Sequence, residues 1–330
     1  MTPDPLRCYA GRVHGRVEVV LNLNARGLRG PSLLAARLAR MATATGAVVH
    51  ATHTLEELER AAAAIASRRA DVVVLAGGDG SCTAGLSALA RFFAPERMPR
   101  VALAPAGTVG TIAKNIGVRG RHVAERVLEA IASGRTREAV WPTLRIEDDA
   151  GGDRVGFTFG TGLVAHFFAV YDAAPAKGLA RAAAIAGRVF FGSFVGDAYA
   201  RRILSPIPCV LTVDGERVSA PAQSLVVASV LPDVGLHFRV TYRAREDANR
   251  FHIVASGLPA RALGPQMPRV LMGRPLHGEP RVDAVASEAT VTFTGDENAY
   301  IVDGELLRAS RVHIGVGRRV TFLLPSPLRG

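Results

Sequence analysis

Two glycine-rich segments, each lying between an apolar run and a helical segment, hold the residue types best suited to chemistry. The first is Gly-Gly-Asp-Gly-Ser at 77–81, directly after the apolar run at 71–76. Glycines allow a sharp turn and let backbone N–H groups approach a ligand, and a helix amino end adds positive partial charge. The segment predicts a phosphate-binding loop, with a plain strand-to-helix turn as the structural alternative.

Asp79 is the acidic side chain of this loop. A carboxylate repels phosphate unless it binds Mg²⁺ or accepts a proton from a hydroxyl group, so Asp79 is the first candidate for catalysis. Two other nucleotide loops fail on spacing. Leu86 stands where a Walker A loop has its lysine, and no G-x-G-x-x-G run fits.

The second segment, Pro-Ala-Gly-Thr-Val-Gly at 105–110, lies between the apolar run 101–104 and a helical stretch through 112–115. Two successive strand–loop–helix units place both loops at the carboxyl edge of one parallel sheet, where such sheets bind ligands. The pair therefore favours nucleotide binding.

Elements of two kinds position these loops. Up to about residue 140, β-branched runs alternate with helical segments, which predicts a parallel α/β sheet. A capping box of Thr54 and Glu57 opens one of the helices. The expected strands are 17–23, 47–52, 71–76 and 101–104, and the expected helices are 32–45, 55–68 and 83–93.

After about residue 140 the sequence indicates a mainly antiparallel β domain interrupted by one helical insertion at 178–203. We therefore expect a nucleotide-binding α/β domain at 1–140 and a β-rich substrate domain at 141–330. The expected strands of the second part are 144–146, 210–213, 224–230, 236–241, 251–255, 290–294, 300–302, 312–314 and 320–324.

The composition restricts the partners. The chain has 330 residues and a net charge of +11, which favours anionic partners, although nearly all of its basic residues are arginine and the bias can reflect coding composition. Only 6% of residues are aromatic and no basic recognition helix is evident, so we expect no nucleic-acid partner. Three scattered cysteines and the lack of a long apolar stretch predict a soluble cytoplasmic protein.

The order of the motifs resembles the diacylglycerol kinase catalytic-domain family, which includes bacterial lipid kinases, sphingosine kinases and ceramide kinases. GGDGS at 77–81 followed by PAGTVGTIAKNIG at 105–117 is the main likeness. An early strand ending in Asn22, FGTGLVA at 159–165 and the Asp-Gly-Glu triplets 214–216 and 303–305 extend it over nearly the whole chain.

The resemblance implies an ATP-binding α/β domain joined to a β-sandwich domain, with the active site in the cleft between them and a requirement for Mg²⁺. It implies that about the last 15–20 residues pack back on the first domain. Asp79 is then a catalytic residue, on Mg²⁺ through water or as a base, and Glu305 is the carboxylate that activates the acceptor hydroxyl. The implied nucleotide-binding residues are Asn22, Asn24, Arg26, Gly77, Gly78, Gly80, Ser81, Gly107 and Thr108.

Several features leave alternatives open. Gly110 stands where the family usually has asparagine, and Asp247 is a metal candidate in an acidic stretch that lacks the usual Asp-Gly. The expected function is ATP-dependent phosphorylation of a diacylglycerol-like or sphingoid lipid alcohol. The alternatives are a degenerate nucleotide- or lipid-binding member and an NAD kinase-type enzyme. For the triplet 214–216 a hairpin turn is the preferred interpretation, and for 303–305 a functional role.

The helical insertion is unusually apolar and rich in small residues. It either lines an acyl-chain pocket or is simply a buried helix, since a helix that is apolar around most of its circumference is usually buried. We expect peripheral contact with an anionic membrane surface. The arginines that could meet anionic headgroups are Arg181, Arg188, Arg201 and Arg202.

Overall fold

A computed structural model describes residues 15–107, 109–174 and 178–326. The chain divides into two units by its internal contacts. One unit contains the chain up to Trp141 together with the stretch from Arg318 onward, and the other contains Pro142–Gly317. The expected combination of a parallel α/β sheet and mainly antiparallel sheets is confirmed.

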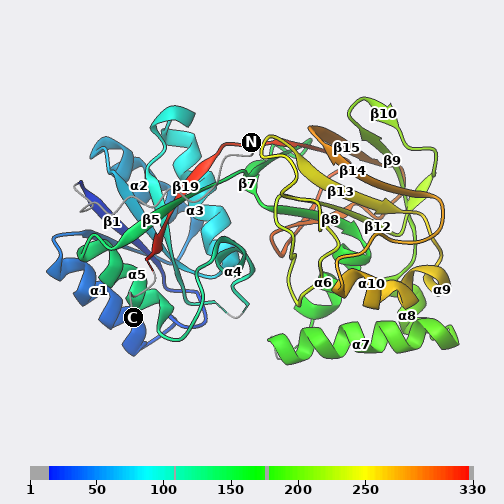
Figure 1. The fold of residues 1–330 in the computed structure, drawn as a ribbon, viewed down its shortest axis with the longest axis horizontal. Helices are drawn as coiled ribbons and strands as arrows, with labels where there is room; N and C mark the ends of the chain where they lie inside the picture. Colours follow the sequence, from blue (N-terminus) through cyan, green and yellow to red (C-terminus); the bar gives the residue numbers. More distant parts are fainter. Residues whose placement is uncertain (1–14, 108, 175–177, 327–330) are drawn as a thin grey trace. The chain divides into compact units, whose positions relative to one another are not determined.

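The first unit is built on a six-stranded sheet in the order β2-β1-β3-β4-β19-β5 (Figure 1). The neighbours from β2 to β19 run parallel, and β5 is antiparallel to β19. All six residues of β3 are buried, as its continuous apolar run predicts. The strands are β1 (Val17–Asn22), β2 (Val48–Thr52), β3 (Val72–Gly77), β4 (Arg100–Pro105), β5 (Thr136–Trp141) and β19 (Val320–Pro325).

Helices cover both faces of this sheet, with α2 and α3 on one and α1 and α5 on the other (Figure 1). The predicted capping box is confirmed at the start of α2, where Thr54 accepts from the Glu57 N–H and Glu57 bonds back to the Thr54 N–H. The helices are α1 (Leu33–Ala44), α2 (Leu55–Ser67), α3 (Asp79–Phe92), α4 (Thr111–Ile116), α5 (Val123–Ala132) and the 3₁₀ turn η1 (Pro95–Arg97).

A buried carboxylate joins three elements of this unit. Glu18 of β1 is only 2% exposed and accepts hydrogen bonds from the Arg68 guanidinium at the end of α2, with Nε at 2.8 Å. His50 of β2 lies 2.6 Å from the same carboxylate. Burial raises the pKa of Glu18, but the hydrogen bonds and charges of Arg68 and His50 outweigh it and hold the pKa below its usual value.

We expect Glu18→Gln to lower the free energy of unfolding at pH 7 by about 1–3 kcal/mol, because the variant loses charge-assisted hydrogen bonds at a buried site. A depressed folded-state pKa stabilises the protein above the unfolded-state pKa of about 4.3, and this contribution disappears as the pH falls through the folded-state value. Denaturant titrations between pH 7 and 3 should therefore show the difference between wild type and variant shrinking in acid. A difference independent of pH would contradict this role.

The second unit contains two antiparallel sheets (Figure 1). Their orders are β10-β9-β15-β18-β6-β7, with β11 also on β9, and β14-β13-β12-β8-β16-β17. The Tyr300 hydroxyl of β16 donates to Asp148 of β6 at 2.5 Å and so ties the two sheets together. The strands are β6 (Leu144–Asp148), β7 (Asp153–Gly156), β8 (Thr158–Gly162), β9 (Ile207–Val213), β10 (Glu216–Arg217), β11 (Ala222–Gln223), β12 (Leu225–Ser229), β13 (Phe251–Ser256), β14 (Arg281–Ala286), β15 (Glu288–Phe293), β16 (Ala299–Val302), β17 (Glu305–Arg308) and β18 (Arg311–Val316).

Helices gather beside these sheets, with α6 directly after β8. The expected single insertion at 178–203 is two helices, because Gly196 adopts a left-handed conformation that ends α7 and Asp197 caps α8. The helices are α6 (Leu163–Asp172), α7 (Leu179–Val195), α8 (Ala198–Ile203), α9 (Ala260–Leu263), α10 (Met267–Leu271) and the 3₁₀ turn η2 (Gly264–Gln266).

Two expectations about individual elements are wrong. The segment 236–241 is a turn, because Leu236 and His237 take positive φ values of 53° and 61° that a strand excludes. Helix α3 begins at Asp79, four residues before the expected start. The strand expected at 320–324 does form, as β19, and it lies between β4 and β5 in the sheet of the first unit, which agrees with the implied return of the last residues to that unit.

Candidate functional site

Three loops meet at the carboxyl edge of the first unit's sheet. They follow β1, β3 and β4, and backbone hydrogen bonds join them. The Ala106 N–H donates to the Gly77 carbonyl at 2.7 Å, and the Gly27 N–H donates to the Ala106 carbonyl at 2.9 Å. The two glycine loops singled out in the sequence are therefore neighbours, and the segment after β1 packs against the second of them.

Glycine is required where the two loops touch. A Cβ at Gly107 would lie 2.5 Å from the Gly78 Cα, a backbone contact that no rotamer change can relieve. A Cβ at Gly77 would overlap the Ser81 side chain. Nothing lies within 4 Å of a Cβ placed on Gly80, so its lack of a side chain leaves open space beside the start of α3. Thr108 lies outside the described residues.

The start of α3 is arranged to receive an anion. Gly78 is its N-cap, so Asp79, Gly80 and Ser81 form its first turn, whose N–H groups have no acceptor within the helix. The Ser81 hydroxyl accepts from the Gly78 N–H at 3.2 Å and from the Asn22 amide at 2.7 Å. Ser81 therefore shapes the loop, while the first-turn amides of α3 remain suited to phosphate oxygens.

Asp79 links the two glycine loops. Its Oδ2 accepts from the Thr111 N–H at 2.8 Å and its Oδ1 from the Ile112 N–H at 3.0 Å, so the carboxylate caps α4 from the neighbouring loop. Burial raises the pKa of Asp79 above its usual value, although these hydrogen bonds and the Lys114 charge oppose the rise. A fixed carboxylate with a raised pKa is a better proton acceptor than an ordinary aspartate.

The surroundings of Asp79 fit a hydrated Mg²⁺ ion. The carboxylate accepts N–H groups of Thr111 and Ile112 and also interacts with the Gly110 backbone N–H, and its two oxygens together still have a lone pair for a further ligand. The described residues contain no group of three or more His, Cys, Asp or Glu side chains able to hold a metal. Mg²⁺ commonly binds one or two carboxylates together with substrate phosphates and keeps several waters, so Asp79 beside a phosphate loop suits it.

The loop after β1 is joined to the phosphate-binding loop mainly through the Asn22 side chain. Besides its bond to Ser81, Asn22 accepts from the Asn24 N–H at 2.9 Å, and the Asn24 amide donates to the His53 carbonyl. Asn24 and Arg26 are both exposed. Asn22 thus connects the first two loops, and Asn24 holds the first loop against the end of β2.

Asp247 does not gather other ligands around it. Its Oδ1 accepts from the Asn249 N–H at 2.8 Å, and its Oδ2 lies 3.9 Å from the Arg250 Nε. Within the described residues, Asp247 is not part of any group of three or more His, Cys, Asp or Glu side chains that could bind a metal. The structure therefore gives no support to a metal at Asp247, whose carboxylate shapes a surface turn.

The Asp-Gly-Glu triplet at 303–305 in the second unit is a hairpin turn between β16 and β17. Asp303 and Gly304 have φ values of 47° and 92°. The Asp303 carboxylate accepts from the N–H groups of Phe157 and Thr158 at 2.9 and 2.8 Å, where the chain passes from β7 to β8. Glu305 follows as the first residue of β17, with an exposed side chain.

The triplet at 214–216 has the same geometry. Asp214 and Gly215 have φ values of 46° and 84°, and Asp214 accepts from the N–H groups of Ser287 and Glu288 at 2.8 and 3.0 Å. The hairpin interpretation therefore applies to both triplets. A turn does not exclude a role for Glu305, because the aspartate makes the structural contacts and leaves the glutamate exposed.

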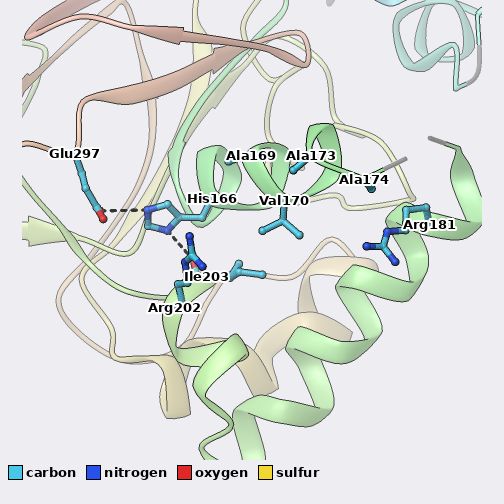
Figure 2. A pocket seen from close by; sticks show the side chains of 9 residues that line it. All are labelled: His166, Ala169, Val170, Ala173, Ala174, Arg181, Arg202, Ile203 and Glu297. Carbon is cyan, nitrogen blue, oxygen red and sulfur yellow. Dashed lines mark hydrogen bonds and ion pairs between the residues drawn. The ribbon is translucent and has the colours of Figure 1, made fainter. Parts of the chain in front are cut away.

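Figure 2 shows a pocket in the second unit to which the helical insertion 178–203 contributes Arg181, Arg202 and Ile203. It has a volume of about 470 Å³, with an apolar wall from α6 and α8 and charged side chains around it. His166 Nδ1 donates to the Ile203 carbonyl at 3.0 Å, and its Nε2 lies 3.2 Å from the Glu297 carboxylate. The lining residues are His166, Ala169, Val170, Ala173, Ala174, Arg181, Arg202, Ile203 and Glu297. Sequence reasoning singled out Arg181 and Arg202 but missed His166 and Glu297, for which the only signal is that His166 directly follows FGTGLVA.

The sequence profile of the diacylglycerol kinase catalytic domain family matches residues 16–141, which include all three loops. These residues belong to that family. A search of curated proteins finds no match.

Solved structures extend the likeness in fold beyond this domain. A diacylglycerol kinase from Bacillus anthracis has a TM-score of 0.60 at 15% identity, over 96% of this chain and 98% of its own. Another protein of that organism, assigned as a diacylglycerol kinase, has a TM-score of 0.65 at 16% identity, over 97% and 99%. Yeast NADH kinase has a TM-score of 0.51 at 10% identity, over 96% and 85%. At these identities the likeness concerns the fold.

Gly107→Ala should lower both stability and nucleotide affinity, because its methyl group meets the Gly78 backbone. We expect a loss of about 1–3 kcal/mol in unfolding free energy, typical of overpacking, and at least about a tenfold loss of ATP affinity. The matched control is Gly80→Ala, which has free space and replaces glycine within a helix. It should leave stability unchanged or raise it by up to about 1 kcal/mol.

Thermal melts and titration with ATP check both variants. Gly80→Ala should still weaken ATP binding, because its methyl group occupies the space into which phosphates would approach α3. Wild-type affinity in Gly80→Ala would contradict phosphate binding at this helix end, and wild-type stability in Gly107→Ala would contradict the close contact between the loops.

Proposed function

We propose that the protein is an ATP-dependent lipid kinase that transfers the γ-phosphate of ATP to the hydroxyl group of a lipid alcohol, diacylglycerol-like or sphingoid. The main support is the junction of Gly78 and Gly107, which places two glycine loops and a helix amino end around Asp79. Kinases of the diacylglycerol kinase catalytic domain family use ATP.

In the proposed reaction, the acceptor oxygen forms a bond to the γ-phosphorus while the bond from that phosphorus to the β–γ bridging oxygen breaks. ADP leaves with the electron pair, and the hydroxyl proton passes to a carboxylate. We assign that carboxylate to Glu305 and the contacts with the phosphate oxygens to the α3 amides, while Asp79 would hold Mg²⁺. Such transfer depends on positioning and charge neutralisation, and Mg²⁺ bound beside Asp79 would supply the latter.

The pocket of the second unit suits an amphiphilic acceptor. Its alanine, valine and isoleucine wall can contact an acyl chain, while Arg181 and Arg202 offer hydrogen bonds and positive charge to a polar headgroup. Such a mixed lining is better matched to a lipid alcohol than to a fully polar acceptor.

A second candidate is a nucleotide-binding protein with little transferase activity. Gly110, in place of the family's usual asparagine, has φ 64° and is the N-cap of α4 without any side-chain cap. Asparagine tolerates this left-handed conformation and nothing lies within 4 Å of a Cβ there, so the missing amide could be accommodated. Its absence is the observation that favours weak catalysis.

The deciding experiment is transfer of radiolabelled γ-phosphate to a panel of lipid alcohols in mixed micelles, with and without Mg²⁺. A labelled lipid that forms only with Mg²⁺ supports the kinase and identifies the acceptor class. ATP binding without a labelled lipid would favour the second candidate, especially if Gly110→Asn restored transfer. Absence of ATP binding would overturn both.

A further inference from the structure

Helix α7 presents an entirely apolar face to solvent. Its packed side consists of Ala182, Ile185, Val189, Gly192 and Ser193, all buried in the second unit. The opposite side contains Leu179, Ala180, Ala183, Ala184, Gly187, Phe191, Phe194 and Val195, with no polar side chain among them. The expectation that this apolar helix is simply buried therefore holds for one side only.

The exposed area on α7 is large. Phe191, Phe194 and Val195 are 71%, 58% and 82% exposed, and Leu179 is 52% exposed. Among the described residues of the second unit, all other large exposed apolar side chains lie on or beside α10. The Phe190 ring lies 5.1 Å from both Phe191 and Phe194, so one end of the face is an aromatic cluster. Exposed apolar area concentrated in this way indicates an interaction surface.

A row of arginines borders one flank of this face. Arg181 and Arg188 are seven residues apart and so lie on the same side of α7. The Arg188 guanidinium stacks over the Tyr199 ring of α8 at 4.0 Å, which places α8 on that flank. Helix α8 adds the exposed Arg201 and Arg202. The acidic residue of this stretch, Asp197, accepts from the Ala200 N–H as the cap of α8.

We infer that α7 docks this protein on a membrane surface containing anionic lipids. The aromatic and aliphatic face enters the boundary between headgroups and acyl chains, and the arginine flank contacts the anionic headgroups. Helix α7 has 17 residues, about 25 Å of helix, and no helix among the described residues is long and apolar enough to cross a membrane. It therefore lies along the surface.

Docking through α7 places the second-unit pocket close to the lipid surface. Arg181 and Arg202, which line that pocket, belong to the same arginine flank (Figure 2). An acceptor lipid could then move from the leaflet into the pocket along this flank. This last step rests on the proposed function, whereas docking itself does not.

The test is sedimentation of the full chain with phosphatidylcholine vesicles, with and without phosphatidylglycerol, in the absence of ATP. Wild type should bind the anionic vesicles and be released by salt, because screening weakens the arginine contacts. Phe191→Ser combined with Phe194→Ser should reduce the partition coefficient at least about tenfold, since both rings lose their burial in lipid. Phe92→Ser, at an exposed phenylalanine of the first unit, is the matched control and should bind like wild type.

Two outcomes would overturn the inference. One is vesicle binding by the double variant equal to that of wild type, with both folded by circular dichroism. The other is a wild-type dimer in analytical ultracentrifugation that the double variant converts to monomer, since the face would then be covered by a second copy. Loss of vesicle binding with unchanged phosphorylation of a short-chain soluble acceptor would support docking separately from catalysis.

Discussion

Replacing Asp79 with asparagine is expected to lower kcat by roughly 10²–10³-fold while leaving the fold intact, because it removes the fixed negative charge that would hold Mg²⁺ beside the phosphates. Asparagine keeps a side-chain oxygen that can accept from Thr111 or Ile112, so α4 retains part of its cap. Only the negative charge and the ability to take a proton are lost. Steady-state kinetics, ATP titration and thermal melts would separate these effects.

Asp79→Ala provides the comparison, because it removes the cap as well as the charge. We expect it to lower the free energy of unfolding by about 1 kcal/mol more than Asp79→Asn does. Wild-type kcat in Asp79→Asn, combined with reduced stability in Asp79→Ala, would show that Asp79 only joins the two loops. The stability effect alone therefore cannot be mistaken for catalysis.

Glu305→Gln is expected to lower kcat by a similar factor, roughly 10²–10⁴-fold, with little change in stability. The side chain is exposed, and the hairpin is held by Asp303 through Phe157 and Thr158, so the amide should not disturb the turn. The loss should appear in kcat rather than in ATP affinity, because we assign Glu305 to the acceptor hydroxyl. Initial rates at saturating ATP, with the acceptor varied, would measure it.

The chain provides its own control for this variant. Glu216 follows the same Asp-Gly turn in the hairpin between β9 and β10, and it is also exposed. Glu216→Gln should leave kcat unchanged. Equal activity of the Glu305→Gln and Glu216→Gln variants would mean that both triplets serve only as turns.

Much of the first unit follows from local pattern. The continuous apolar run of β3, the capping box at Thr54 and the two glycine loops each depend on residues close together in the chain. Because parallel strands place their carboxyl ends at one edge, the meeting of the two loops could also be predicted. The sequence places the start of α3 too late, because glycine is a poor helix former and yet Gly80 lies in the first turn of this helix.

Contacts between distant segments decided the rest. The return of β19 to the first sheet depends on pairing with β4 and β5, which strand propensity does not encode. The capping of α4 by Asp79 joins residues that lie 32 positions apart in the chain. The two Asp-Gly-Glu turns are alike in sequence and in backbone geometry, so local sequence does not distinguish a functional triplet from a structural one. The open face of α7 is apolar like its buried face, so only the packed fold distinguishes them. Local sequence determines which elements form, whereas burial and pairing depend on the whole chain.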